Sequence, residues 1–203
     1  MGLQKLRSLL LGGVMAAAIA LAPSVSVAVP IIDFSDGGVG GGTLAFDGTN
    51  VTGTDIVVTK LLVTGTPIAN GTYDVQNGRL NFSTAANTLT LTGHINALSI
   101  TTDVSLISNG HFGAFTWIPG NGFQGSGTDT KFPGLLTAVG LPSNTAFAFF
   151  GFSIGGVGTA PGTINVTSTD IKNTAVPEPA SALLLGAGLA GMGLWGMKRR
   201  KNV

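Results

Sequence analysis

The chain lacks cysteine altogether and has few of the side chains that enzymes use for acid–base chemistry. It has two histidines and nine acidic residues among 203, and Glu178 is its single glutamate. The absence of cysteine excludes thiol catalysis and disulfide cross-links. His94 with Asp103 and one of the many serines could form a triad, but no Gly-x-Ser-x-Gly turn marks a nucleophile. We therefore expect a protein that is not an enzyme and uses no cofactor.

Metal-binding patterns are also scarce. The Gly-rich segment 33–47 places Asp36 before a run of glycines, and carboxylate and backbone oxygens of this kind can bind Ca²⁺. Neither a repeated Gly-Gly-x-Gly-x-Asp pattern nor EF-hand spacing is present. The segment is therefore predicted to be a flexible leader before the first strand, and no metal site is predicted.

Charged residues are few and unevenly distributed. Only 9% of the residues are Asp, Glu, Lys or Arg. Most of the basic residues lie near the two ends of the chain, so that residues 29–197 contain four bases against nine acids. The central part of the chain is therefore weakly acidic. This composition excludes the basic surface that binding to nucleic acid requires.

The N-terminal residues are organised as a secretory signal peptide. Lys5 and Arg7 precede an apolar stretch at 9–22, and Ser26 and Ala28 are small residues at the positions that a signal peptidase reads. We expect residues 1–28 to be a signal peptide that is cleaved after Ala28, so that the protein is exported. A retained N-terminal membrane helix is the alternative.

A second apolar segment, at about 180–197, is just long enough to cross a bilayer as a helix. Trp195 suits the membrane interface, and four basic residues then favour the cytoplasmic side: Lys198, Arg199, Arg200 and Lys201. The many glycines of this segment lower its helix propensity. We therefore predict a transmembrane segment that serves as a temporary anchor in the inner membrane.

A short motif at 176–181 lies directly before this segment. It contains Val176, Pro177, Glu178, Pro179 and Ala180. The two prolines fix φ on either side of Glu178 and keep the peptide extended, so it can stand at the membrane surface and be recognised there. An ordinary Pro-rich stalk before a membrane helix is the alternative.

Together, the motif, the apolar span and the basic tail resemble the C-terminal region of PEP-CTERM sorting-domain proteins, which Gram-negative bacteria export. The resemblance is confined to residues 176–203. It implies recognition by exosortase, a membrane protease or transpeptidase, and delivery to the cell surface or to an extracellular polysaccharide matrix. The exported domain, at 29–175, resembles no family that we recognise.

This exported domain is predicted to be all-β. Short runs rich in Val, Ile, Thr and Phe alternate with Gly, Asn, Asp and Pro at spacings too short for crossover helices. A single β-sandwich or jelly roll is the expected architecture. The clearest strands are predicted at 55–64, 87–100, 104–107, 111–118, 146–154 and 162–171.

Four local predictions accompany this fold. Asn77-Gly78 can form a two-residue turn, which predicts a hairpin over 71–82. Pro133 can begin a short helix that Gly140 ends, and this helix would cover one end of the sandwich. The Gly-rich segment 119–130 is predicted to be a long surface loop. Strand alternation places Phe150 and Phe152 on one sheet face and Phe147 and Phe149 on the other.

We expect the domain to be a structural component of the cell surface or of an exopolysaccharide-rich, biofilm-type matrix. The alternative is a secreted carbohydrate-binding module, in which Trp117 or Tyr73 would stack on sugar rings if exposed. A third hypothesis is a hydrolase that depends on His94 or His111. The expected partners are exosortase, the membrane and, as a candidate, exopolysaccharide.

Overall fold

The computed structural model describes residues 29–119, 122–157 and 162–176. The predicted signal peptide with Ala28, the transmembrane segment and the basic residues Lys198 to Lys201 lie outside the described residues. The described part forms nine strands and two short helices. They are β1 (Ile31–Ser35), β2 (Thr43–Phe46), β3 (Val51–Thr64), β4 (Gly71–Ser83), β5 (Thr88–Ile95), η1 (Asn96–Leu98), β6 (Ile100–Ile118), β7 (Gly122–Lys131), α2 (Pro133–Ala138), β8 (Ala146–Val157) and β9 (Gly162–Ala175).

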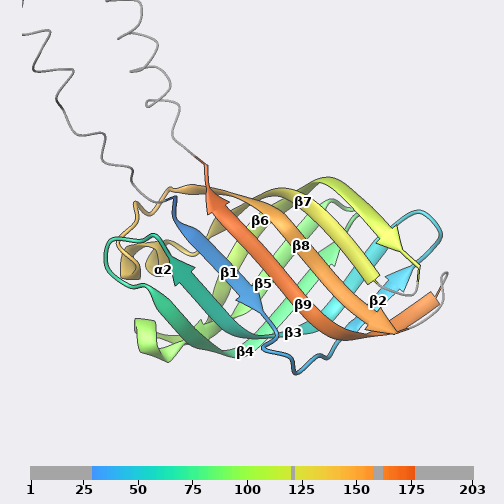
Figure 1. Cartoon of the computed structure of the whole chain (residues 1–203), viewed down its shortest axis with the longest axis horizontal. Helices are drawn as coiled ribbons and strands as arrows, with labels where there is room; N and C mark the ends of the chain where they lie inside the picture. Colours follow the sequence, from blue (N-terminus) through green and yellow to red (C-terminus); the bar gives the residue numbers. More distant parts are fainter. Residues whose placement is uncertain (1–28, 120–121, 158–161, 177–203) are drawn as a thin grey trace, which may run out of the picture.

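The strands form one antiparallel sheet that closes on itself. From β3 to β9 each strand pairs with the next along the chain, and β1 and β2 both pair with β3 on one side and with β9 on the other. The result is an up-and-down cylinder of strands, and in Figure 1 the strands in front slope across those behind. Closure gives every described strand two hydrogen-bonded neighbours.

β1 and β2 act as two halves of one interrupted strand. β1 pairs with the C-terminal parts of β3 and β9, whereas β2 pairs with their N-terminal parts. The Gly-rich loop between them is held by Asp36, whose carboxylate accepts hydrogen bonds from the backbone N–H groups of Gly38 (3.0 Å) and Gly40 (2.9 Å). The predicted flexible leader is therefore wrong, because residues 31–35 and 43–46 are strands within the closed sheet.

The all-β prediction is confirmed, but the expected sandwich or jelly roll differs from the structure. A sandwich has two sheets with separate edges, whereas here one sheet closes in a ring. The difference arises in two places that the sequence pattern missed. The leader supplies β1 and β2, which close the gap between β3 and β9, and the predicted loop at 119–130 contains β7, which joins β6 to β8.

The predicted hairpin over 71–82 is wrong, because β4 runs through Asn77 and Gly78 without turning. Asn77 has the positive φ that the dipeptide favours, at 53°, but it uses this conformation in a bulge. The pairing of β4 with β5 shifts register between Gln76 and Arg79. A Cβ on Gly78 would lie 2.0 Å from the carbonyl oxygen of Val58, so the glycine allows the neighbouring strand to approach.

The interior is filled by side chains from all parts of the ring. A group of phenylalanines among these side chains makes stacked, tilted and edge-to-face contacts with ring centroids 5.1–5.8 Å apart: Phe82, Phe112, Phe123, Phe149 and Phe152. The prediction that Phe152 faces away from Phe149 is wrong. A bulge between Phe149 and Gly151 adds one residue and returns Phe152 to the inner face.

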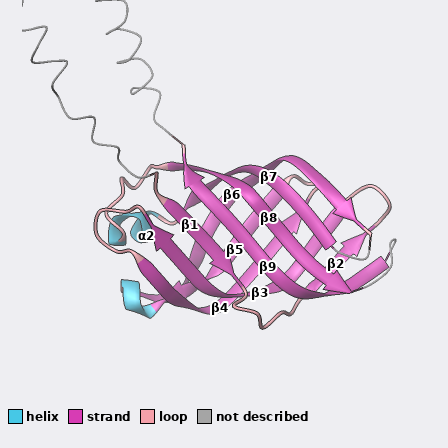
Figure 2. Ribbon diagram, viewed as in Figure 1, coloured by secondary structure: helices cyan, strands magenta, loops and turns pink. Residues whose placement is uncertain are grey.

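Both helices lie at one end of the cylinder (Figure 2). The predicted helix is confirmed as α2, which has Pro133 in its first turn and ends before Gly140, where φ is +81°. Its buried Leu135 and Leu136 cover this end of the core. Among the described residues, no helix has the length and apolar character needed to cross a membrane.

Candidate functional site

The last described segment of the chain ends at Val176, one residue after the end of β9. The backbone N–H of Ala175 donates to Pro30 O (3.0 Å), and that of Val176 donates to Ala146 O (2.8 Å). The residues that begin β1 therefore lie beside the residues that end β9. Val176 is 41% exposed and is the only residue of the predicted 176–181 motif within the described part of the chain. Pro177, Glu178, Pro179 and Ala180 lie outside it.

A charged cluster that the sequence analysis did not predict lies inside the cylinder. Asp129 and Lys131 stand two residues apart on β7, so both lie on its inner face. Their side chains form an ion pair with no solvent exposure. Asn173 on β9 donates from Nδ2 to Asp129 Oδ2 (2.7 Å). The ammonium of Lys131 lies 5.2 Å from the centre of the Phe147 ring and 6.0 Å from that of Phe34. Burial lowers the pKa of Lys131 to about 8, although Asp129 opposes the shift.

This cluster was missed for an identifiable reason. Asp129 and Lys131 stand two residues apart in a segment whose glycines suggested a loop. A strand with period-two alternation would place both on the same face. The domain has only four basic residues, so an acid and a base two positions apart could have indicated an ion pair on one face of a strand.

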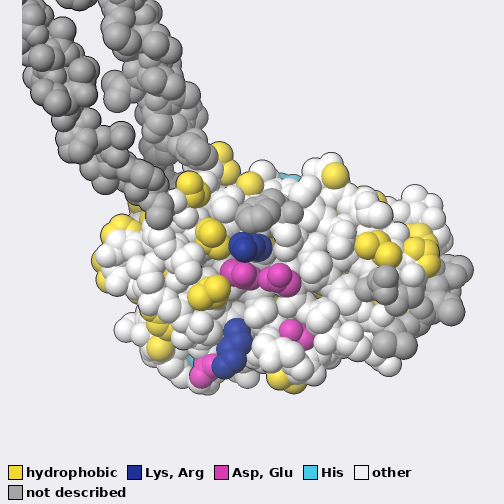
Figure 3. Space-filling view, viewed as in Figure 1, with side chains coloured by type: hydrophobic (Ala, Val, Ile, Leu, Met, Phe, Trp, Pro, Cys, Tyr) yellow, Lys and Arg dark blue, Asp and Glu magenta, His cyan; other side chains and the backbone are white. Residues whose placement is uncertain are grey.

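Two carboxyl groups lie together on the outer surface. Asp33 on β1 and Asp170 on β9 interact, with Lys172 close enough to influence them. The pKa of Asp33 is raised to about 7. Partial burial is the largest cause, and a hydrogen bond with Asp170 and charge repulsion from Asp170 add to it. Figure 3 shows charged side chains gathered in the middle of this face, within a surface that is otherwise largely uncharged.

The structure brings together two members of the triad considered above. His94 Nδ1 and Asp103 Oδ1 are 2.6 Å apart, and Asn77 donates to the other carboxylate oxygen of Asp103 (3.2 Å). The hydrogen bond from His94 lowers the pKa of Asp103. The ring of His111 instead contacts the backbone oxygen of Asn87 (2.9 Å). Within the described part of the chain, no serine side chain forms a hydrogen bond with His94.

Two surface grooves are candidates for ligand binding. The larger, about 810 Å³, lies near η1 and α2, and Tyr73 forms part of its wall with Leu98 and Phe132. The smaller, about 480 Å³, lies over β6, β7 and β8. The smaller groove combines an aromatic ring with amide, hydroxyl and carboxyl groups: Phe115, Thr116, Gln124, Ser126, Ser153 and Asp170.

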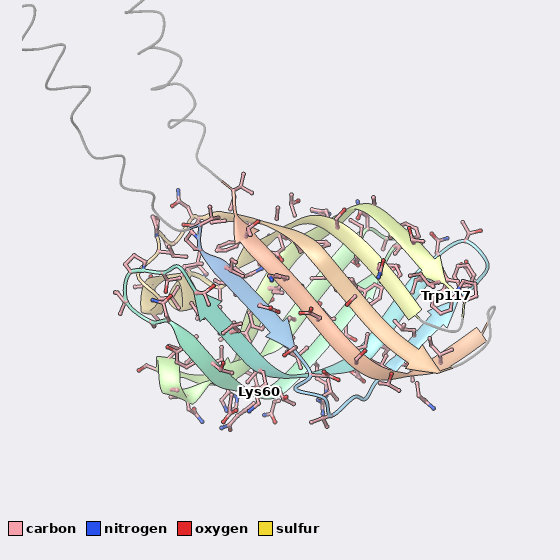
Figure 4. All side chains as sticks on the ribbon, viewed as in Figure 1. Lys60 and Trp117 are labelled. Atoms are coloured by element: carbon pink, nitrogen blue, oxygen red, sulfur yellow. The ribbon has the colours of Figure 1, made fainter. Side chains whose placement is uncertain are left out.

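Trp117 is less available to a ligand than these residues. Its ring is stacked on Phe46, with centroids 4.8 Å apart and planes at 10°. The indole Nε1 is buried without a hydrogen-bond partner. Trp117 lies at the end of the cylinder away from α2, and its contact with Phe46 helps to close that end (Figure 4). The exposed Lys60, also marked there, pairs with Asp74 at 2.5 Å.

The decisive comparison concerns the C-terminal end. Residues 175–201 match the PEP-CTERM protein-sorting motif. This motif implies that the chain is exported, processed by an exosortase and sorted to the cell surface. Comparisons of the chain with curated proteins and with solved structures gave no match.

The PEP-CTERM motif begins within the folded domain. Its first matched residue, Ala175, is the last residue of β9, and Val176 still donates a hydrogen bond to the sheet. The remaining residues of the match therefore follow directly after the last strand of the cylinder in the sequence. Any force applied through the C-terminal end also enters the domain directly through β9.

Proposed function

We propose that this chain is a non-enzymatic structural protein of the cell surface or extracellular matrix, held briefly in the inner membrane and released by an exosortase. The observation that carries the proposal is the PEP-CTERM motif, which begins at Ala175, the last residue of β9. The exported domain also supports this proposal. A closed sheet with few charges offers a durable unit with a surface of hydroxyl and amide groups, which suits a hydrated polysaccharide matrix.

Intact mass and location of the protein in its native host test this proposal. The wild type is compared with a variant in which Pro177, Glu178 and Pro179 are replaced by alanine, and Pro142→Ala serves as the matched control. We expect wild type and control outside the cell without either terminal segment, and the triple variant in the inner membrane. If all three proteins keep the C-terminal segment and stay in the inner membrane, the proposal is wrong.

A second candidate function is carbohydrate binding, which the smaller groove favours. Sugar recognition commonly combines an aromatic face with amide and hydroxyl partners, and this groove provides Phe115, 38% exposed, beside Gln124 and Ser126. In this proposal the groove binds a segment of the exopolysaccharide into which the protein is released.

Affinity electrophoresis in gels containing purified exopolysaccharide distinguishes the two functions. A binding module is retarded by the polysaccharide, and Gln124→Ala weakens the retardation while Val39→Ala, at an exposed site outside the groove, does not. A purely structural component migrates independently of the polysaccharide. Equal retardation of wild type and Gln124→Ala would remove the groove from the proposal.

The non-enzymatic part of the proposal has its own test. The pair of His94 and Asp103 is the arrangement in this domain closest to catalytic machinery. We expect no turnover on a panel of glycans and esters. Turnover that disappears in His94→Ala but persists in His111→Ala would replace the proposal with a hydrolase.

A further inference from the structure

The cluster inside the cylinder contains the three groups needed to join two side chains by an amide bond. Lys131 supplies an amine, Asn173 supplies a carboxamide, and both contact the carboxylate of Asp129. We propose that Lys131 and Asn173 form an intramolecular isopeptide bond, with Asp129 transferring the protons. Because the three side chains are brought together by folding alone, the reaction needs no other enzyme or cofactor.

The positions of the three groups favour this reaction over simple ion pairing. The two oxygens of one carboxylate bind the amine and the amide side by side. Such positioning raises the effective concentration of an attacking group by many orders of magnitude. The strands concerned, β7 and β9, are separated by β8 in the sheet. The contact is therefore made over β8, on the inner face of the sheet.

The surroundings of Lys131 favour the nucleophilic form of its amine. Nζ is buried between the rings of Phe34 and Phe147, and burial lowers the pKa of Lys131 to about 8. An exposed lysine is almost entirely protonated at neutral pH, and an amine attacks a carbonyl carbon only when unprotonated. In a medium of low polarity, transfer of a proton from Nζ to Asp129 also replaces two buried charges by two neutral groups.

Asn173 contains an unsatisfied atom that this chemistry would use. Its Oδ1 is buried and has no hydrogen-bond partner. The two ends of an asparagine amide are assigned by their hydrogen bonds. Rotation of the Asn173 amide group by 180° places Oδ1, in place of Nδ2, beside Asp129. A protonated Asp129 would then donate to Oδ1 and polarise the carbonyl group for attack at Cγ.

The reaction is balanced in atoms and charge. Nζ passes one proton to Asp129 and attacks Cγ of Asn173. Asp129 then gives a proton to Nδ2, a new bond joins Nζ to Cγ, and the bond from Cγ to Nδ2 breaks. The tetrahedral centre collapses to an amide as Nδ2 leaves as ammonia. Asp129 takes up the remaining proton from Nζ and loses it when the ammonia reaches solvent as ammonium.

The ion pair alone is a weaker explanation of the cluster. A fully buried ion pair contributes little or nothing to stability compared with apolar side chains of the same volume. Here it also leaves an amide oxygen without a partner. The proposed bond removes the charge of Lys131 from the interior and fixes β9 to β7. Asn173 is two residues from Ala175, where the PEP-CTERM motif begins, so the bond lies next to the point of attachment.

Peptide mapping of the full chain, purified from its native host, tests the proposal without any variant. In linked protein, trypsin does not cleave after Lys131. Peptide 80–172 then stays joined to the peptide that begins at Asn173, with a mass lower than the sum of the two by one ammonia molecule. Normal cleavage after Lys131 and recovery of unmodified Lys131 and Asn173 peptides would overturn the proposal.

Two variants assign the roles. Lys131→Arg keeps a positive charge but should abolish the branched peptide completely. Asp129→Asn keeps the shape of the side chain, and loss of proton transfer should slow the linkage by about 10²-fold or more. Circular dichroism shows whether each variant has folded. Full linkage in folded Asp129→Asn protein would exclude Asp129, and a branch to any other residue would exclude the assigned pair.

Discussion

At the scale of single residues, several glycines in the strands are required by neighbouring backbone rather than by turns. Gly78 and Gly127 have no positive φ, yet a Cβ on them would lie 2.0 Å from Val58 O and 1.9 Å from His111 O, respectively. Both stand beside shifts in the pairing register, where one strand bends toward the next. The absence of a side chain at these positions therefore permits the curvature that closes the sheet.

Alanine at Gly78 should show this constraint. We expect Gly78→Ala to lower the free energy of unfolding by about 3 kcal/mol, because the new methyl group forces β3 and β4 apart. Gly113→Ala is the matched control, since its nearest neighbour would be 3.8 Å away, and we expect it to cost less than about 1 kcal/mol. Urea unfolding of both variants provides the measurement, and equal losses would contradict this account.

The carboxyl pair on the outer surface predicts a dependence of stability on pH. The pKa of Asp33 rises from 3.8 to about 7 on folding, so the folded state binds more protons between these values. This contribution to stability is complete below pH 4 and is lost as the pH rises through 7. Asp33→Asn should remove it. At pH 8 the variant should be more stable than wild type, because it has no charge at this partly buried position beside Asp170. The gain should be at most about 1 kcal/mol, because water screens these half-exposed groups.

Thermal unfolding at pH 5 and pH 8 measures the effect. The difference between the variant and wild type should be clearly larger at pH 8 than at pH 5. Asp74→Asn provides a control on a carboxylate that pairs with Lys60 at the surface, and it should not stabilise the protein at pH 8. A difference independent of pH would show that Asp33 does not retain its proton in the folded state.

At the scale of secondary structure, α2 is a short helix that contributes to stability by covering one end of the core. Six residues make a marginal helix by themselves. Leu135 and Leu136 nevertheless lie at 0% and 1% exposure, and Val139 follows at 0%. The helix is therefore held by the core that it closes, and it separates the interior of the cylinder from water at this end.

Removal of one of these side chains should destabilise the whole domain. We expect Leu135→Ala to lower the free energy of unfolding by about 3 kcal/mol, because it removes buried apolar surface and leaves a cavity. Thr137→Ala, at an exposed position of the same helix, should cost less than about 1 kcal/mol. Chemical unfolding followed by Trp117 fluorescence compares them, and a loss below about 1 kcal/mol for Leu135→Ala would refute the role of α2 as a cover.

At the scale of the whole molecule, closure of the sheet removes the edges through which β proteins associate. Every described strand has a partner on each side, and β1 and β2 together occupy the position between β3 and β9. An open sheet of this length would present unpaired N–H and C=O groups to other copies. If the released protein associates within a matrix, it does so through its side chains and not through strand pairing.

Opening the ring should reverse this behaviour. Ile32→Pro removes a backbone donor from β1, which pairs with both β3 and β9, and it also truncates a fully buried side chain. We expect the variant to aggregate with increased thioflavin-T fluorescence, whereas Val29→Pro, before β1, should behave like wild type. A folded, non-aggregating Ile32→Pro protein would show that β1 is not needed for closure.

The sequence determined the class of structure and the fate of the chain. The β-branched runs of β3 and β9 and the Pro–Gly boundaries of α2 are local patterns, and the structure has an element of the predicted type at each of them. The strand predicted at 87–100 is only partly confirmed, because β5 ends at Ile95 and η1 follows. The PEP-CTERM motif is likewise read from contiguous residues. Such features depend on neighbours in the chain, so they can be recognised without knowledge of the fold.

Only the tertiary structure decided how the strands close and which polar residues meet. Asn77-Gly78 favours a positive φ equally in a turn and in a bulge, and only the partner strands select the bulge. The same holds for Asp129 and Asn173, which are distant in sequence and form a hydrogen bond because β7, β8 and β9 are neighbours in the ring. Closure of the sheet depends on hydrogen bonds between strands that are far apart in the sequence. No single segment therefore contains a residue pattern that predicts it.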